Sequence, residues 1–297
     1  IDGFYIFING NPVLDAADYT WPKRCAELEV YIFTCKHHDT YELGPMESLD
    51  STLSEVFNLR LATSDFKSKL NATIEKLCNT DYEEIKEKHI SAHKEWFSNV
   101  EFILPESEIS ALPTNRRLKE LKWDEYDPDL FALYYNFGRY LLIESSGKNA
   151  RLPANLQGIW CHDFNPPWGS DFHTNINLQM NYWPAGCANL SETSKPFTHF
   201  MKMISRFGES TAKELFEARG WIVNHTTDPY GKTGVHDSVD CGFFPMAGPW
   251  LCLNLWEHYE YTGDIEYLKE IYPILKGSCE FVCDYLTEDS NGYLVTS

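Results

Sequence analysis

Residues 250–286 read WLCLNLWEHYEYTGDIEYLKEIYPILKGSCEFVCDYL, and their apolar positions recur every three or four residues, the period of an amphipathic helix. We expect helices over Trp250–Tyr261, Ile265–Ile274 and Ser278–Leu286, with Gly263 ending the first. Turns this short join consecutive helices into αα-hairpins. A series of such hairpins tends to close into a bundle or a toroid, so the sequence predicts a mainly α fold.

The helical period continues toward the N-terminus as far as Phe66. Asp127-Pro128 opens a strong helix, because Asp favours the N-cap and Pro the first turn. Before Phe66 the pattern is that of β structure, with an Asn9-Gly10 turn. Val100–Leu104 is a short apolar run that fits a strand. The remaining expected elements are helices at Asp81–Phe97, Ser194–Ser205 and Glu209–Arg219, and strands at Phe4–Ile8, Leu28–Thr34 and Val56–Thr63.

The charge of the chain excludes some classes of partner. A formal net charge of −19 argues against nucleic acid and against an anionic membrane surface, since both need clustered Lys and Arg. Nine cysteines without a CxxC pair indicate neither a disulfide framework nor a metal site, and no cofactor is expected. The aromatic content of 15 % fits a sugar site, where aromatic faces cover pyranose rings, but an aromatic-rich core gives the same number.

The polar chemistry is concentrated between Arg151 and Pro184, in LPANLQGIW (152–160), NPPWGSD (165–171) and HTNINLQMNYW (173–183). Buried amides destabilise a fold unless they are hydrogen-bonded, so we expect this stretch to line a wet cleft. Amides alternate with apolar residues from Asn175 to Tyr182, which in an extended chain puts Asn175, Asn177, Gln179 and Asn181 on one face. On a helix, Asn175 and Asn177 would point about 200° apart. The simpler alternative is the polar face of an ordinary strand or helix.

These motifs, together with NLSE (189–192), the Gly220–Asp228 segment and WLCLNLWEHYEYTGD (250–264), resemble glycoside hydrolase family 95, the inverting 1,2-α-L-fucosidases. The resemblance runs from about Tyr82 to Ser297. It implies an (α/α)6 barrel of the six-hairpin glycosidase type, preceded by a β-domain and a helical linker. On this basis we expect the tail of the β-domain in residues 1–65, the linker in 66–120 and the first part of a truncated catalytic domain in 121–297.

The resemblance also implies the mechanism. In an inverting enzyme, water attacks one face of the anomeric carbon while an acid protonates the leaving oxygen. Asn175 and Asn177 match the pair that holds and helps activate this water, supported by an Asp far downstream. His173 is similarly placed to bind the sugar, with Trp250 and Trp168 as further substrate-binding residues. The general acid is a Glu beyond the Leu294-Val295-Thr296 stretch, so we expect an incomplete barrel and no activity from these 297 residues alone.

Local carboxylates are weaker candidates for the proton donor. Solvation, helix capping or binding of a sugar hydroxyl explains each of them more simply. They are Asp163, Asp171, Asp228, Asp237, Asp240 and Glu257.

Three alternatives stay open. Departures from the family pattern at Cys161-His162-Asp163 and in the Tyr230–Phe244 loop leave the sugar undecided between L-fucose and L-galactose. A non-catalytic protein that binds fucosyl-glycans would keep the cleft without the acid, and a purely structural helical repeat would have no sugar site. Fucosylated glycans lie mostly outside cells, so we expect secretion, which would permit glycosylation at the sequons of Asn71, Asn189 and Asn224.

Overall fold

The computed structural model describes residues 4–8, 11–13, 30–34, 63–121, 127–163 and 165–296, with side chains from residue 70 onward apart from Glu120. The chain forms two compact units, Ile1–Lys67 and Ser68–Ser297. The first contains a three-stranded antiparallel sheet in the order β2-β1-β3, built from β1 (Phe4–Ile8), β2 (Asn11–Val13) and β3 (Val30–Thr34). Two of the predicted strands fall on β1 and β3. Residues 56–62 of the predicted strand Val56–Thr63 lie outside the described residues. Its last residue, Thr63, begins a helix.

Helices α2 (Thr63–Cys78) and α3 (Tyr82–Phe97) follow. The prediction for α3 is confirmed, and its N-cap is Asp81, whose carboxylate accepts a hydrogen bond from the Glu83 N–H at 2.9 Å. The predicted strand at Val100–Leu104 is wrong, because these residues form no ladder and Ile103 is exposed. The short elements η2 (Glu108–Ala111) and α4 (Thr114–Glu120) then lead to α5 (Pro128–Ser146), which begins at the predicted Pro.

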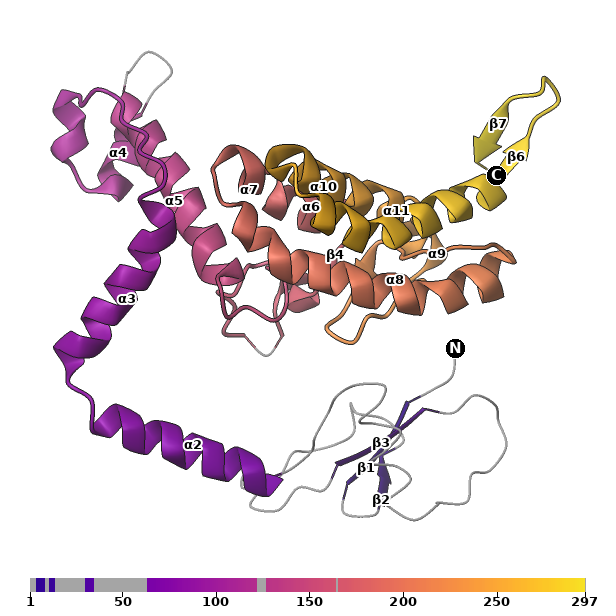
Figure 1. The fold of residues 1–297 in the computed structure, drawn as a ribbon, viewed down its shortest axis with the longest axis horizontal. Coiled ribbons are helices and arrows are strands. Elements are labelled where there is room, and N and C mark those ends of the chain that lie inside the picture. Colours follow the sequence, from indigo (N-terminus) through magenta and orange to yellow (C-terminus); the bar gives the residue numbers. More distant parts are fainter. Residues whose placement is uncertain are drawn as a thin grey trace. The chain divides into compact units, whose positions relative to one another are not determined.

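The remaining helices are packed side by side (Figure 1). Helix α8 (Ser194–Phe216) contacts both α5 and α11 (Ile265–Tyr285), and α10 (Ala247–Thr262) packs on α11 and α8. Helix α10 also covers the short helices α6 (Asn177–Tyr182) and α7 (Pro184–Cys187). The described part of the chain is therefore mainly helical, as expected. Its smaller elements are η3 (Pro167–Ser170), η4 (Ser191–Thr193), α9 (Val239–Gly242) and the strands β4 (Phe172–His173), β5 (Thr226–Thr227), β6 (Leu286–Glu288) and β7 (Leu294–Thr296).

Two predicted helix breaks are wrong. Helix α8 runs without interruption through residues 206–208, and α11 runs through residues 275–277. Gly208 and Gly277, which lie in these stretches, allow close packing inside continuous helices. A Cβ on Gly208 would lie 2.3 Å from the Ile222 carbonyl oxygen, and one on Gly277 would lie 2.9 Å from the Trp221 ring.

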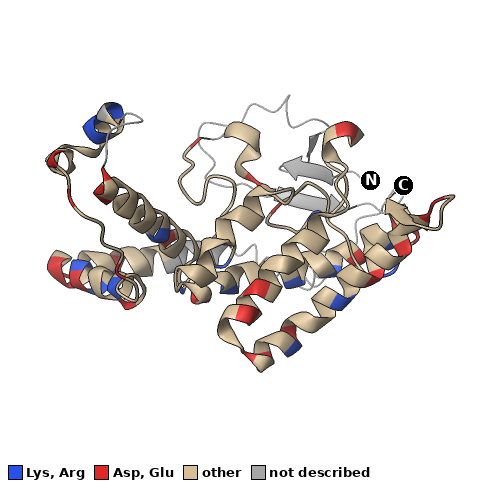
Figure 2. Cartoon of the chain, turned by 90° about the horizontal axis from the view of Figure 1, so that it is seen from above, with Lys and Arg blue, Asp and Glu red and all other residues tan. Residues whose placement is uncertain are grey.

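The core sits between α8, α10, α11 and the segment after α8. Trp221 is 2 % exposed and its indole N–H donates to the Ile274 carbonyl at 2.8 Å, which joins that segment to α11. Lys and Arg are scattered among Asp and Glu over the described helices (Figure 2). The closest basic grouping, on α4, includes Arg117, whose charge is paired with Asp127. No helix among the described residues has the length and apolar character needed to cross a membrane.

Candidate active site

Two long loops are joined at the candidate site by a minimal antiparallel ladder. Strand β4 lies in the connection between α5 and α6, and β5 lies in the connection between α8 and α9, with Phe172 opposite Thr227 and His173 opposite Thr226. The Thr174 N–H extends the ladder by donating to the His225 carbonyl at 2.7 Å. Thr174 also donates its hydroxyl to the Asn224 carbonyl. Because these residues are buried or nearly so, the two loops form one rigid unit.

Asn224 and Tyr182 hold this unit in place. The Asn224 side chain is fully buried, donates to the Thr233 carbonyl at 3.0 Å and accepts from the Phe244 N–H at 3.1 Å. A glycan is therefore excluded from Asn224 in the folded chain. The Tyr182 hydroxyl accepts from the Ala154 N–H at 2.9 Å and lies 2.8 Å from the Ser146 hydroxyl. Burial raises the pKa of Tyr182 to about 12, so it stays a neutral anchor between α6 and the LPAN loop.

His173 is placed by β4 with its ring between a carboxylate and a second imidazole. Its Nδ1 lies 2.5 Å from Oδ1 of Asp171. The two atoms are in close contact but are not aligned as in a hydrogen bond. On another side, the His225 ring meets His173 edge to face, with centroids 5.9 Å apart.

Asn175 and Asn177 lie on either side of a sharp change in the backbone. Asn175 is in the turn after β4 and Asn177 is the first residue of α6, and both are half-buried. The predicted extended segment is thus confirmed only as far as this turn. From Asn177 onward the chain is helical, so the prediction of one polar face through Asn181 is wrong.

The two later amides have structural roles. Gln179 is buried and donates its side-chain N–H to the Thr174 carbonyl at 2.6 Å. Asn181 donates to the carbonyls of Ala154 and Asn155 at 3.3 and 3.1 Å. Because residues two apart on a helix point about 200° apart, Gln179 lies on the buried side of α6 with Leu178 and Tyr182, whereas Asn181 is half-buried.

The two predicted tryptophans are in different environments. Trp250 is in the first turn of α10, half-buried, with its ring 6.4 Å from that of Phe244. Helix α10 packs on α6, the helix that Asn177 begins, and Asn254 of α10 donates to the Gln179 carbonyl at 3.0 Å. Trp168 is 76 % exposed, in a turn where Trp168, Gly169 and Ser170 all have positive φ. That turn leads directly into Asp171 and β4.

Unsatisfied polar atoms mark this region. Among the described residues, six buried side-chain oxygen or nitrogen atoms have no hydrogen-bond partner, and all six belong to the loop before β4, to β4 or β5, or to the turn and helix α6 that follow β4. Such atoms are uncommon in a folded protein and each calls for a ligand, a water or a functional explanation. They are Oε1 of Gln157, Oδ1 of Asp171, Nδ1 of His173, Oδ1 of Asn175, Oε1 of Gln179 and Oγ1 of Thr227.

The local carboxylates are mostly engaged elsewhere. Asp228 accepts the N–H groups of Tyr230 and Lys232 in a turn. Asp237 is exposed and lies 3.7 Å from His225 and 3.5 Å from His236. A hydrogen bond from the Ser238 hydroxyl lowers the pKa of Asp240. Of the six candidates, Asp171 is the one paired with a predicted site residue. No group of three or more metal-ligating side chains occurs in the described ranges.

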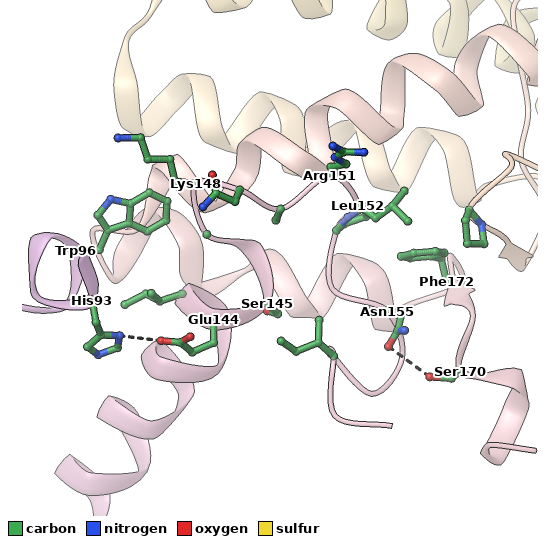
Figure 3. Close-up of a pocket in the computed structure, with 18 of the residues that line it drawn as sticks. His93, Trp96, Glu144, Ser145, Lys148, Arg151, Leu152, Asn155, Ser170 and Phe172 are labelled. Carbon is green, nitrogen blue, oxygen red and sulfur yellow. Dashed lines mark hydrogen bonds and ion pairs between the residues drawn. The ribbon is translucent and has the colours of Figure 1, made fainter. Parts of the chain in front are cut away.

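A cavity of about 940 Å³ opens beside this region, between α3, the end of α5 and the loop before β4 (Figure 3). Asp171 and Asn155 line it, but none of the five predicted site residues does. On the α3 side, His93 and Glu144 face each other at 2.9 Å next to Trp96. The sequence did not indicate these residues, because His93 and Glu144 are 51 positions apart on two ordinary amphipathic helices.

Comparisons with known proteins match most of this chain. The model of the glycosyl hydrolase family 95 catalytic domain matches residues 81–297. The chain is 38 % identical over 227 residues to Alpha-L-fucosidase 2 of Arabidopsis thaliana, which covers 73 % of this chain and 26 % of that protein. It is 32 % identical over 225 residues to Probable alpha-fucosidase A of Aspergillus niger. This match covers 74 % of this chain and 28 % of the relative. The chain thus spans about a quarter of the length of these curated relatives.

Proposed function

The chain belongs to glycosyl hydrolase family 95, and we propose that it supplies the water-binding part of an active site that releases terminal α-1,2-linked L-fucose from glycans with inversion. The observation that carries this proposal is the group of six unsatisfied polar atoms on β4, β5, α6 and the loop before β4. Oδ1 of Asp171 and Nδ1 of His173 face each other, and a hydroxyl-rich ligand and an ordered water would serve the remaining atoms of the site. The names of the relatives support fucose as the sugar.

Asn175 and Asn177 are assigned to the attacking water. The Asn175 amide oxygen is buried without a partner, and such an oxygen accepts a hydrogen bond from water and orients it. A neutral amide is a poor base, so a carboxylate must finally take the proton. His173 is assigned to a sugar hydroxyl, and Trp250 and Trp168 to the apolar faces of the glycan.

We assign the general acid Glu and the supporting Asp to residues outside this sequence, because the described candidate carboxylates have other partners or are solvated. In the same proposal, α5, α8 and α11 are outer helices and α6 and α10 inner helices of an (α/α)6 barrel. Residues 1–65 are the tail of a β-domain and 66–120 a linker. We also propose that the protein acts outside the cell, where fucosylated glycans are found.

The test is hydrolysis of 2′-fucosyllactose by the full-length gene product and by these 297 residues, with the released anomer followed by NMR. We expect β-fucose from the gene product and no turnover from the shorter chain. Asn177→Ala should lower kcat by about 10²-fold or more, because a displaced water loses its attack geometry. Asn71→Ala, on the exposed surface of α2, is the matched control.

Other outcomes separate the alternatives. Release of α-fucose would contradict inversion. Binding of 2′-fucosyllactose without release, by a folded gene product, would favour a non-catalytic glycan-binding protein. Faster cleavage of the corresponding α-L-galactoside would identify the sugar as L-galactose.

A further inference from the structure

Asp171 and His173 face each other, and no other described residue forms a hydrogen bond with their facing atoms. Their facing atoms, Oδ1 and Nδ1, lie 2.5 Å apart. Both atoms are buried, and neither has a hydrogen-bond partner elsewhere in the described part of the chain. The side chains as a whole are 24 % and 16 % exposed, so the rest of each side chain still reaches the surface of the site.

The backbone holds both residues where they are. Asp171 follows three consecutive residues with positive φ, two of which, Trp168 and Ser170, are not glycine. Its carbonyl accepts from the Leu156 N–H at 2.9 Å. Two residues later, His173 is fixed opposite Thr226 in the β4–β5 ladder. A strained turn followed at once by a pinned strand leaves Asp171 little freedom to turn away.

The groups around the His173 ring leave one nitrogen for a ligand. Asp171 faces Nδ1, and the His225 ring lies edge to face, with its own Nδ1 3.2 Å from the Gly242 carbonyl and its Nε2 3.7 Å from Asp237. Nε2 of His173 is in no recorded hydrogen bond or ion pair with a described residue. An imidazole that donates from Nδ1 has a lone pair on Nε2.

We infer that Asp171 is a positioning residue, which holds the proton of His173 on Nδ1 so that Nε2 accepts a hydrogen bond from a sugar hydroxyl. This rests on the proposed function only for the identity of the ligand. Hydrogen bonds at such sites are often poorly aligned without ligand and tighten when it binds, which fits the present alignment of the pair. A carboxylate on the far nitrogen of a working histidine fixes its tautomer and ring orientation.

The chain offers a matched control for this carboxylate. Asp163 lies on the same loop, beside His162 with 3.6 Å between Oδ1 and Nε2. Both of these side chains are mostly exposed, at 59 % and 95 %. Asp163→Asn therefore makes the same chemical change in an Asp–His pair that positions nothing.

The experiment is ¹⁵N NMR of the histidines, selectively labelled, in the wild-type 297-residue chain, Asp171→Asn and Asp163→Asn, with His173→Gln to assign the signal. We expect neutral His173 to carry its proton on Nδ1 in the wild type and in Asp163→Asn, and on Nε2 in Asp171→Asn. A wild-type His173 with its proton on Nε2, or one unaffected by Asp171→Asn, would overturn the inference. If Asp171→Asn does not fold, the wild-type spectrum alone decides.

Kinetics of the full-length gene product give a second readout. Asp171→Asn should raise KM for 2′-fucosyllactose by about 10-fold and change kcat much less, since binding is affected more than chemistry. Equal KM values for the two Asn variants would contradict the inference. Absence of any fucosidase activity would instead count against the proposed function, and the tautomer measurement would stand independently.

Discussion

At the scale of the residue, the amides of the candidate site divide into two groups. Asn181 and Asn224 form hydrogen bonds with backbone groups and so hold the loops together. Asn175 has a buried oxygen without a partner. The first group is expected to contribute to stability and the second to function, which gives the two groups different mutational signatures.

Asn224→Gln tests the structural group. The longer side chain has to fit a fully buried position and disturbs two hydrogen bonds, so we expect a loss of about 2–4 kcal/mol in the free energy of unfolding. Urea denaturation followed by tryptophan fluorescence would measure it. Asn71→Gln makes the same change on the exposed surface of α2 and should be nearly neutral. Equal stabilities of the two variants would show that Asn224 holds nothing in place.

At the scale of the element, Gly220 determines how closely the end of α8 approaches α11. It has φ +67°, and a Cβ there would lie 1.8 Å from the Gly277 carbonyl oxygen. Gly220→Ala should therefore destabilise the chain by about 2–4 kcal/mol, through a backbone clash added to an unfavourable φ. Gly263 has a similar φ of +64° with no atom within 4 Å, so Gly263→Ala isolates the cost of φ alone, about 1 kcal/mol. Thermal unfolding of both variants compares the two, and equal losses would contradict the close approach.

A buried ion pair joins α4 to the start of α5. Nε and Nη2 of Arg117 donate to the two carboxylate oxygens of Asp127, each at 2.8 Å. This hydrogen bonding is the largest cause of the lowered pKa of Asp127, and the hydroxyl of Ser110 adds a smaller lowering effect. Burial acts in the opposite direction and raises the pKa. A lowered folded-state pKa means that the stabilisation is fully present above the ordinary Asp value near about 4 and is lost as the pH falls below it.

Asp127→Asn should thus lower Tm at pH 7 by on the order of 10 °C, since it leaves a buried guanidinium with only the half-exposed Asp129 as its charge partner. The difference from the wild type should shrink as the pH falls below about 4. Asp129→Asn removes the half-exposed second partner of Arg117 and should cost less, because solvent screens that contact. Calorimetric scans across this range make the comparison. A Tm difference that does not change with pH would refute the electrostatic origin.

Much at this scale followed from the sequence. The apolar period placed α3, α5, α10 and α11. One face of α5, α10 and α11 is buried, and α3 packs on α5 with its apolar side only partly covered. The predicted breaks at residues 206–208 and 275–277 failed because the helices continue there, with Gly208 and Gly277 at close contacts with neighbouring segments. The helical start at Asn177 was missed because packing against α10 overrides a period of two. The Asp171–His173 pair depends on a turn with three positive φ values, which no pattern of residues indicates.

At the scale of the whole molecule, net charge is the dominant property. The formal charge of −19 is repulsive within the folded chain, and salt shortens the range of that repulsion from roughly 30 Å at 0.01 M to about 8 Å at 0.15 M. We expect Tm to rise by on the order of 3 °C between these conditions in NaCl. Sulfate is unsuitable for the comparison because it also strengthens apolar burial. A Tm that falls as NaCl is added would mean that attractive surface pairs outweigh the repulsion.

The two-residue ladder between β4 and β5 has a consequence for the order of events in folding. It pairs Phe172 with Thr227 and His173 with Thr226, which are 55 and 53 residues apart, so it can form only after the intervening chain, including α8, has been brought back on itself. Closing such a long loop costs conformational entropy, and the hydrogen bonds of the ladder offset this cost only once it has formed. We therefore expect this contact to form late in folding. A sugar that binds only the assembled loops should then leave the refolding rate unchanged and lower the unfolding rate. Substrate would therefore lengthen the lifetime of the native state without speeding its formation.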